Sequence, residues 1–159
     1  MIVQAAAPAA RKAALRTEMR RRLAALAPAE KAARSAAIAA RIEELLAAEK
    51  TDGVLAAYWP RPGEPDTRHL LVRAGLGGRS VVLPRVRAPG AALTWHKMSR
   101  RGFRLTAGYR GLLEPGLENP GFAAARIALM LVPSISVDRA GRRLGSGLGF
   151  YDITFAAAR

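Results

Sequence analysis

Cysteine is absent from the 159 residues, which excludes disulfides, thiolate metal ligands and a cysteine nucleophile. Long hydrophobic runs are also absent, because no apolar stretch approaches the ~20 residues that a membrane-spanning helix needs. The first residues, MIVQAAAP, lack the basic start and the long apolar stretch of a secretion signal. We therefore expect a cytoplasmic protein in a reducing compartment, with no membrane partner.

Acidic residues are scarce: 12 Asp and Glu stand against 26 Lys and Arg, and the formal net charge is +14. A strongly basic protein can bind nucleic acid. The charge, however, is spread evenly, with +5, +5 and +4 over residues 1–50, 51–100 and 101–159. Because no basic tail or block stands out, a small anionic substrate is favoured over nucleic acid, which remains an alternative.

The chain begins with two predicted helices, residues 9–27 and 29–49, and Pro28 suits the first turn of the second. Lys12 and Arg16 lie four residues apart at the margin of an apolar stripe on the first helix. This spacing aims both side chains partly toward the protein body. From this stretch alone, cationic residues at the rim of a packed helix are the favoured interpretation. The stripe consists of Leu15, Met19, Leu23 and Leu26.

Short apolar runs alternate with helices in the rest of the chain, a pattern typical of an α/β domain with a mainly parallel sheet. Ligands of such sheets bind beyond the carboxyl ends of the strands. The length predicts a single domain, residues 1–159. Strands are predicted over 53–59, 80–86, 91–98 and 127–132, the last as a central strand; helices over 67–74, capped by Asp66 or Thr67, and from Gly149 onward; irregular structure over 99–126.

The most informative segment follows the last predicted strand and ends at Asp152. It holds Gly145, Gly147 and Gly149 just before a helix start. Glycines there can take positive φ, and free N–H groups at a helix start face an anion. Paired arginines ending at Arg143 add positive charge, and Asp152 supplies a carboxylate for a metal. These parts suit a phosphate–magnesium site, although the spacing matches neither the Walker lysine loop nor the dinucleotide fingerprint.

Other candidate residues carry less information on their own. Glu64 lies in a loop after a predicted strand, where a solvated glutamate is the ordinary interpretation. Trp59 fits core packing, or the wall of a site for an aromatic ligand. Neither histidine has a partner at metal-ligand spacing, so no catalytic role is expected for them. Ser134 and Ser136 lack a G-x-S-x-G setting, which argues against a hydrolase triad.

Taken in order along the chain, these segments resemble the 5-formyltetrahydrofolate cyclo-ligase family, also called methenyltetrahydrofolate synthetases. The resemblance covers almost the entire chain, and its strength lies in the order of the motifs rather than in any single one. The matching segments are 12–16 (KAALR), 58–67 (YWPRPGEPDT), 83–86 (LPRV), 111–115 (GLLEP), Val132-Pro133 with Asp138, and 143–152 (RLGSGLGFYD).

The resemblance implies a three-layer α/β/α, Rossmann-like domain, preceded by two helices, that acts on small molecules. It also implies an enzyme that uses ATP and Mg2+ to convert 5-formyltetrahydrofolate to 5,10-methenyltetrahydrofolate, with release of ADP and phosphate. In that chemistry the formyl oxygen is phosphorylated, N10 of the folate attacks the activated carbon, and phosphate leaves. Such a reaction needs positioning and neutralisation of charge more than covalent help. We expect a monomer or a weak homo-oligomer.

By matching position, the resemblance also assigns roles to residues. Arg143, Tyr151 and Lys12 would be catalytic, and Asp152 would hold Mg2+. The folate would contact Arg16, Glu64, Trp59 and Phe150, with the carboxylate of Glu64 accepting N–H groups of the pterin. The nucleotide would contact Lys12, Arg16, Arg143, Leu144, Gly145, Ser146, Gly147, Leu148, Gly149, Phe150 and Tyr151.

Three positions depart from the family pattern. Leu148 stands where glycine is common, Phe150 where tyrosine is usual, and Ile153 where arginine often follows the aspartate. Family members also continue past the last helix, whereas this chain stops at Arg159. We therefore expect a C-terminal end truncated relative to the family, with part of the site missing. A non-catalytic relative that retains nucleotide or folate binding is accordingly a second hypothesis, and a basic nucleic-acid-binding domain is a third.

Overall fold

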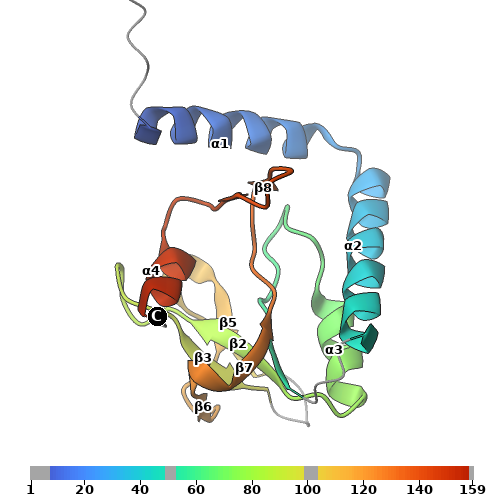
Figure 1. The fold of residues 1–159 in the computed structure, drawn as a ribbon, viewed down its shortest axis with the longest axis vertical. Helices are drawn as coiled ribbons and strands as arrows, with labels where there is room; N and C mark the ends of the chain where they lie inside the picture. The colour runs from blue at the N-terminus through green and yellow to red at the C-terminus, as the bar shows by residue number, and fades with distance from the viewer. Residues whose placement is uncertain (1–7, 49–52, 99–103, 158–159) are drawn as a thin grey trace, which may run out of the picture.

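The structure is a computed structural model that describes residues 8–48, 53–98 and 104–157. Its first two elements are the long helices α1 (Pro8–Ala25) and α2 (Pro28–Ala48), which confirms the two predicted N-terminal helices. Pro28 is the first residue of α2, where its missing N–H costs no helical hydrogen bond. Figure 1 shows α1 across one end of the sheet and α2 along its side. Neither helix contains a buried residue.

Within the described residues the central sheet has five strands in the order β6-β3-β2-β1-β7. β1 runs parallel to both β2 and β7, whereas β3 runs antiparallel to its two neighbours. The prediction of a mainly parallel sheet is therefore confirmed. The strands are β1 (Val54–Ala56), β2 (Val81–Arg85), β3 (Thr94–Lys97), β6 (Gly121–Phe122) and β7 (Ile127–Met130).

The prediction that residues 127–132 form a central strand is wrong, because β7 lies at one edge of the described sheet. The physical reason is that both faces of this edge strand are covered. Leu129 packs against the apolar cluster on one face of the sheet, and Met130 packs against the cluster on the other. An edge strand covered on both faces carries the continuous apolar run that usually marks a central one.

The sheet is sandwiched between helices, which confirms the three-layer arrangement. On one face, Leu71 of α3 (Arg68–Leu76) packs with Leu55 and Val81. On the other face, Phe150 of α4 (Phe150–Ala157) packs with Val82 and Trp95. Successive residues of each strand therefore face opposite layers, as the period of two requires. Fully burying a side chain such as leucine stabilises the fold by about 1.5–3 kcal/mol.

The start of α3 is capped by Asp66, one of the two residues predicted for this role. Thr67 is the N-cap residue, but its hydroxyl donates to the carbonyl of Tyr58, at 2.9 Å, and makes no capping hydrogen bond. Asp66 does that work instead, because its Oδ1 accepts the N–H of Arg68 at 3.0 Å. Thr67 therefore links the start of α3 to the turn after β1, and Asp66 accepts a backbone N–H group that has no acceptor within the helix.

Residues 99–126 were predicted to be irregular, and for 104–126 this is wrong. This part forms the hairpin of β4 (Leu105–Ala107) and β5 (Leu113–Pro115), two 3-10 turns, and β6. Residues 99–103 lie outside the described part. The strands here have only two or three residues, too few for a period of two to stand out in the sequence. The 3-10 turns are η1 (Tyr109–Gly111) and η2 (Ala124–Arg126).

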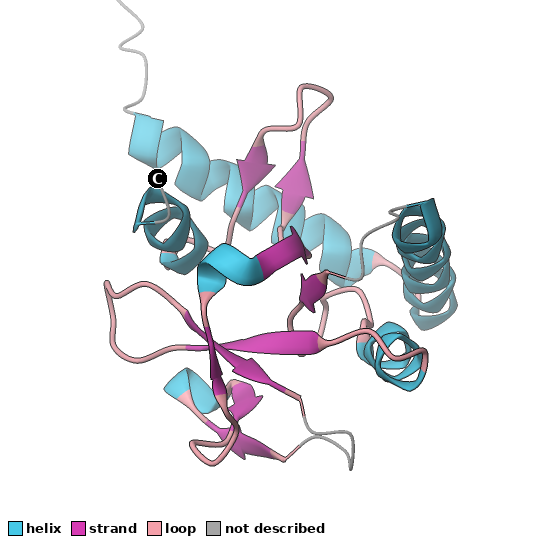
Figure 2. Ribbon diagram, turned by 60° about the horizontal axis from the view of Figure 1, so that its bottom comes forward, coloured by secondary structure: helices cyan, strands magenta, loops and turns pink. Residues whose placement is uncertain are grey.

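The segment after β7 forms a second hairpin, β8 (Ser136–Val137) with β9 (Arg143–Leu144). It reaches from the sheet toward α1, as Figures 1 and 2 both show. The chain then passes through Gly145–Gly149, here called the glycine loop, and enters α4. The glycine loop, the turn after β1 and α1 consequently meet near the carboxyl ends of the parallel strands.

Candidate functional site

A cavity of about 860 Å³ occupies this meeting place. Its walls come from α1, α2, the turn after β1, the end of β2, β5, the residues after β7, and the glycine loop with the start of α4. All the residues that the sequence assigns to ligands lie on this one cavity: Lys12, Arg16, Trp59, Glu64, Arg143, Leu144, Gly145, Ser146, Gly147, Leu148, Gly149, Phe150, Tyr151 and Asp152.

The backbone of the glycine loop explains two of its glycines. Gly147 has a φ of 106° and Gly149 a φ of 74°, values that favour glycine strongly. Leu148 does not take a positive φ; among the described non-glycine residues only Arg110 does. Leu148 instead packs against the apolar cluster around Trp95. The departure from glycine at position 148 therefore places no strain on this backbone.

The N–H groups of the glycine loop are available to a ligand. Across the described parts of the chain, no backbone carbonyl accepts a hydrogen bond from the N–H groups of residues 145–149. Backbone donors in such a loop, next to a helix start, form a site for an anion. The anion-binding role that the glycine spacing predicts stays a prediction, with these N–H groups as its physical basis.

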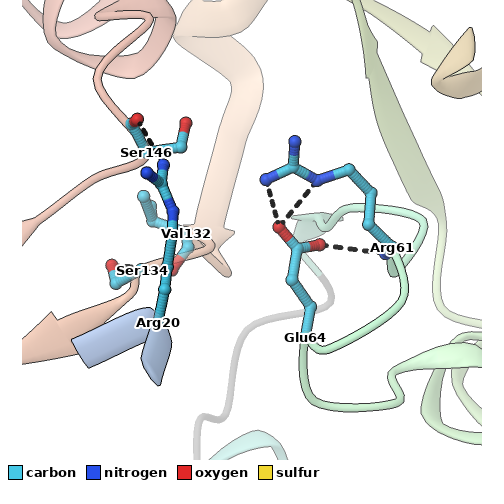
Figure 3. Close-up of polar contacts among 6 residues, drawn as sticks. All are labelled: Arg20, Arg61, Glu64, Val132, Ser134 and Ser146. Atoms are coloured by element: carbon cyan, nitrogen blue, oxygen red, sulfur yellow. Dashed lines mark hydrogen bonds and ion pairs between the residues drawn. The ribbon is translucent and has the colours of Figure 1, made fainter. Parts of the chain in front are cut away.

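Two arginines of α1 bind carbonyl oxygens of the glycine loop. Arg16 Nε donates to the carbonyl oxygen of Gly145 at 3.0 Å, and Arg20 Nη2 donates to that of Ser146 at 3.1 Å. Figure 3 shows the second contact. The Arg16 side chain thus reaches across to residues 129 positions away in the sequence rather than lying along its own helix.

Arg20 was missed by the sequence analysis. It lies one further helical turn along the row that Lys12 and Arg16 begin, at the same spacing of four. That spacing was the signal that could have found it, because residues four apart share a helix face. Lys12 also lines the cavity and is exposed.

Arg143 and Asp152 form an ion pair across the mouth of the glycine loop. The Arg143 guanidinium also lies over the ring of Tyr151, 6.0 Å from its centroid. The Asp152 side chain is 73% exposed, so solvent screens the pair. In the described part of the chain no group of three or more His, Cys, Asp or Glu side chains could hold a metal ion. Asp152 is therefore a single carboxylate whose present partner is an arginine.

The hydroxyl of Tyr151 is buried and has no hydrogen-bond partner among the described residues. Burial raises the pKa of Tyr151 far above its ordinary value, and the nearby Glu64 raises it further. Burial likewise raises the pKa of Tyr58 to about 12. Both phenols consequently stay protonated near neutral pH. The Tyr151 side chain lines the cavity, and its buried hydroxyl keeps a proton that no described residue accepts.

Glu64 is held by Arg61, three residues earlier. Its Oε1 accepts from Arg61 Nε at 3.0 Å and Nη2 at 2.8 Å, and its Oε2 accepts the Arg61 backbone N–H at 3.0 Å. Figure 3 shows this arrangement, which fixes the carboxylate in the turn after β1. The Glu64 side chain is 19% exposed. A glutamate fixed in this way is a positioned acceptor rather than an ordinary solvated loop residue.

Phe150 is mainly a core residue, 8% exposed, with its ring edge-on to that of Tyr109 at 5.4 Å between centroids. It belongs to the apolar cluster around Trp95 and also lines the cavity. The change from the usual tyrosine therefore falls at a largely buried position.

Glu114 is a second residue that the sequence analysis left without a role. It lies on the cavity wall, is 3% exposed, and accepts the N–H of Val86 at 3.3 Å through Oε1. Its Oε2 has no partner among the described residues. Burial raises its pKa, against the opposing effects of the Val86 N–H and the Arg85 guanidinium. A Cβ at Gly108 would lie 2.0 Å from Oε2, so the carboxyl group needs glycine there.

Fold and cavity together define an α/β protein with a cationic, glycine-lined cleft at the carboxyl edge of its sheet. The sequence profile of the 5-formyltetrahydrofolate cyclo-ligase family matches residues 8–159, so the chain belongs to this family. Among the described helices, none combines the length and the apolar character needed to cross a membrane.

Individual relatives agree with this assignment. The chain is 40% identical over 105 residues to a protein of Mycolicibacterium smegmatis named 5-formyltetrahydrofolate cyclo-ligase, a match covering 62% of this chain and 52% of that protein. The chain therefore spans about half the length of the curated relative that it matches.

Two solved structures share the fold. The 5,10-methenyltetrahydrofolate synthetase of Aquifex aeolicus matches with a TM-score of 0.77 and 25% identity, over 91% of this chain and 72% of that one. The 5,10-methenyltetrahydrofolate synthetase of Mycoplasma pneumoniae matches with a TM-score of 0.72 and 20% identity, over 91% and 77% of the two chains.

Proposed function

We propose that this chain is a 5-formyltetrahydrofolate cyclo-ligase that uses ATP and Mg2+ to form 5,10-methenyltetrahydrofolate, ADP and phosphate. The observation that carries the proposal is the single cavity that brings together the cationic row of α1, the glycine loop and the fixed carboxylate of Glu64. Family membership supports the same activity. A cytoplasmic location and small-molecule partners remain part of the proposal.

The residues around the glycine loop suit a polyphosphate. The unused N–H groups of residues 145–149 face no carbonyl, and the side chains of Lys12, Arg16 and Arg143 supply three positive charges on the same cavity. ATP supplies the phosphoryl group that activates the formyl oxygen. Lys12 and Arg143 would neutralise charge as it develops, which is the main demand of phosphoryl transfer. Tyr151, protonated at neutral pH, would donate a hydrogen bond.

Asp152 would hold Mg2+. A lone carboxylate fits this ion, because Mg2+ is usually bound by one or two carboxylates together with substrate phosphates and water. In the structure Arg143 occupies that carboxylate. Binding of the metal nucleotide would therefore require Arg143 to exchange Asp152, whose side chain is exposed, for the phosphates.

The folate would lie on the other side of the cavity, against the turn after β1. Glu64 presents a fixed carboxylate to the amino and ring N–H groups of the pterin. Trp59 and Phe150 would contact the rings, and Arg16, which lines the same cavity, would lie near both the folate and the phosphates. The reacting formyl group would consequently lie between Glu64 and the glycine loop.

The deciding experiment follows the absorbance of methenyltetrahydrofolate formed by the pure protein from 5-formyltetrahydrofolate and Mg2+, with and without ATP. ATP-dependent product that disappears in Asp152→Ala is the expected result. Absence of ATP-dependent product would refute the proposal. Calorimetric titration with ATP and folate would then separate a binding-only relative from a nucleic-acid-binding protein, which should show steep salt-dependent binding to mixed DNA or RNA.

A further inference from the structure

A second cavity, of about 560 Å³, adjoins the first and shares eight lining residues with it: Arg20, Trp59, Arg61, Pro62, Leu112, Leu113, Ser146 and Leu148. The turn at η1 forms its outer wall. Tyr109 and Arg110 of this turn line the second cavity but not the first. Three arginines line the second cavity, Arg20, Arg61 and Arg110, and no acidic residue of the described parts does. The roles proposed for the first cavity leave this space without an occupant.

The three guanidinium groups differ in how far their charge is neutralised. Arg61 is paired with Glu64. Among the described residues Arg20 has no carboxylate partner and donates to the neutral carbonyl of Ser146, a contact that Figure 3 shows beside the Arg61–Glu64 pair. Arg110 lies over the Tyr109 ring at 5.4 Å and has no carboxylate partner among the described residues. The second cavity therefore carries uncompensated positive charge from Arg20 and Arg110.

The backbone at Arg110 is a second, independent sign of function. Its φ of 51° and ψ of 36° place an arginine in the left-handed region, where glycine or asparagine is more stable. The turn is fixed by hydrogen bonds from Gly108 N–H to the Leu112 carbonyl at 2.7 Å and from Leu112 N–H to the Tyr109 carbonyl at 3.1 Å. These hydrogen bonds hold the backbone of Arg110 at the wall of the second cavity, which its side chain lines.

We propose that the second cavity binds the glutamyl end of the folate, with its carboxylates paired to Arg110 and Arg20. This inference rests on the proposed function. The substrate has a hydrogen-bonding pterin at one end and carboxylates at the other, and Glu64 attracts the first and repels the second. An arginine fork matches a carboxylate with two parallel hydrogen bonds. Trp59 lines both cavities and lies where the ring that joins the two ends of the folate would pass.

Each additional γ-linked glutamate adds a carboxylate, so affinity is expected to increase with tail length. The test is direct calorimetric binding of 5-formyltetrahydrofolate, as the mono- and the triglutamate, without ATP, to the wild type and to Arg110→Gln and Arg110→Lys. Arg110→Gln should weaken triglutamate binding by about tenfold and monoglutamate binding less, while Arg110→Lys retains part of the gain. The matched control is Arg126→Gln, since Arg126 stacks on Phe122 outside both cavities.

The phosphates of ATP are the alternative ligand for the arginines of the second cavity. Measuring the affinity of each variant for ATP alone distinguishes phosphate binding from carboxylate binding. An Arg110→Gln variant that loses affinity for ATP and keeps its affinity for the triglutamate would overturn the proposal. Equal triglutamate affinity in Arg110→Gln, Arg126→Gln and the wild type would overturn it too. Folate binding by a wild type that shows no turnover would refute only the proposed catalytic function, whereas a wild type that binds no folate refutes both.

Folding of the variants is checked by Arg110→Asn, because asparagine tolerates the left-handed region. Its thermal midpoint should stay level or rise by about 2 °C, while its triglutamate affinity falls as in Arg110→Gln. Unchanged triglutamate affinity in a stably folded Arg110→Asn would overturn the proposal.

Discussion

The wall of the cavity that the sheet provides and the wall that α1 provides are held in place by different interactions. Behind the sheet wall lie side chains with essentially no exposed surface, such as Leu55, Val82 and Leu83. The helix α1 has no buried residue at all, and its arginines bind backbone carbonyls of the glycine loop. One wall is fixed by apolar burial and the other by a few polar contacts.

This difference has a functional meaning. Elements with few buried apolar contacts and exposed hydrogen bonds open at lower free energy than the packed core does. If the proposed function holds, the sheet wall with Glu64 next to it would be the rigid reference that positions the folate. The α1 wall, which carries Lys12 and Arg16, would then adjust to the phosphates of ATP.

The largest expected effect is a loss of stability when the apolar packing of the sheet wall is disrupted. Leu71→Ala removes a fully buried side chain between α3 and the sheet and should lower the free energy of unfolding by about 2–5 kcal/mol. The matched change on the other wall is Leu15→Ala, where the leucine is 46% exposed and the expected loss is below about 1 kcal/mol. Urea denaturation of both variants measures the contrast. Similar losses would show that α1 packs as firmly as the sheet does.

The next prediction concerns the ion pair at the loop mouth. Asp152→Asn should lower kcat by about 100-fold, because the proposed metal ligand loses its charge, and should change stability by less than about 1 kcal/mol, because the pair is exposed. Asp138→Asn is the control, since Asp138 pairs with Arg142 and lines neither cavity. Equal kcat in the two variants would contradict a role for Asp152.

A smaller effect sharpens the picture of the α1 wall. Arg16→Ala removes the contact to the Gly145 carbonyl and should lower kcat/KM by about tenfold, with little change in the free energy of unfolding. Arg21→Ala lies on the same helix but pairs with Glu18 away from both cavities, so it should leave kcat/KM unchanged. If both variants behave alike, α1 contributes charge in general rather than a specific contact.

The smallest effect is a pH dependence of stability from Glu114. Burial raises the pKa of this carboxyl group above its ordinary 4.5, so the folded state keeps a proton that the unfolded state has already released. The associated stability is present below pH 4.5 and is lost as pH rises through the folded pKa. Glu114→Gln should remove this slope. Denaturant titrations of both proteins between pH 4 and 7 test it, and parallel curves would contradict the raised pKa.

The sequence predicted those parts whose cause is local. The proline at the start of α2 and the apolar runs at β1 and β2 report on their own neighbourhoods, and the structure confirms them. The edge position of β7 has a non-local cause, because Leu129 and Met130 are covered by segments far away in the chain. No pattern within residues 127–132 records which strand lies next to them.

The same distinction holds for the candidate site. The glycine loop could be singled out because its glycines, arginine and aspartate are close together in the sequence. Arg20 was missed although it continues the four-residue spacing of Lys12 and Arg16, and the buried role of Glu114 could not be predicted, because a glutamate before a proline carries no local sign of burial. Arg20 reaches a carbonyl 126 residues away, and the burial of Glu114 depends on the open space at Gly108.

In the contacts between α1 and the glycine loop, arginine side chains donate to main-chain carbonyl oxygens. The two partners therefore tolerate amino-acid substitution to different degrees. Any residue at position 146 still presents a carbonyl to Arg20, whereas a change of Arg20 itself removes the donor. The side chain at position 146 can therefore vary with the ligand while the loop stays attached. Mutational drift is expected to be tolerated at Ser146 and to be costly on the α1 side of the same contact.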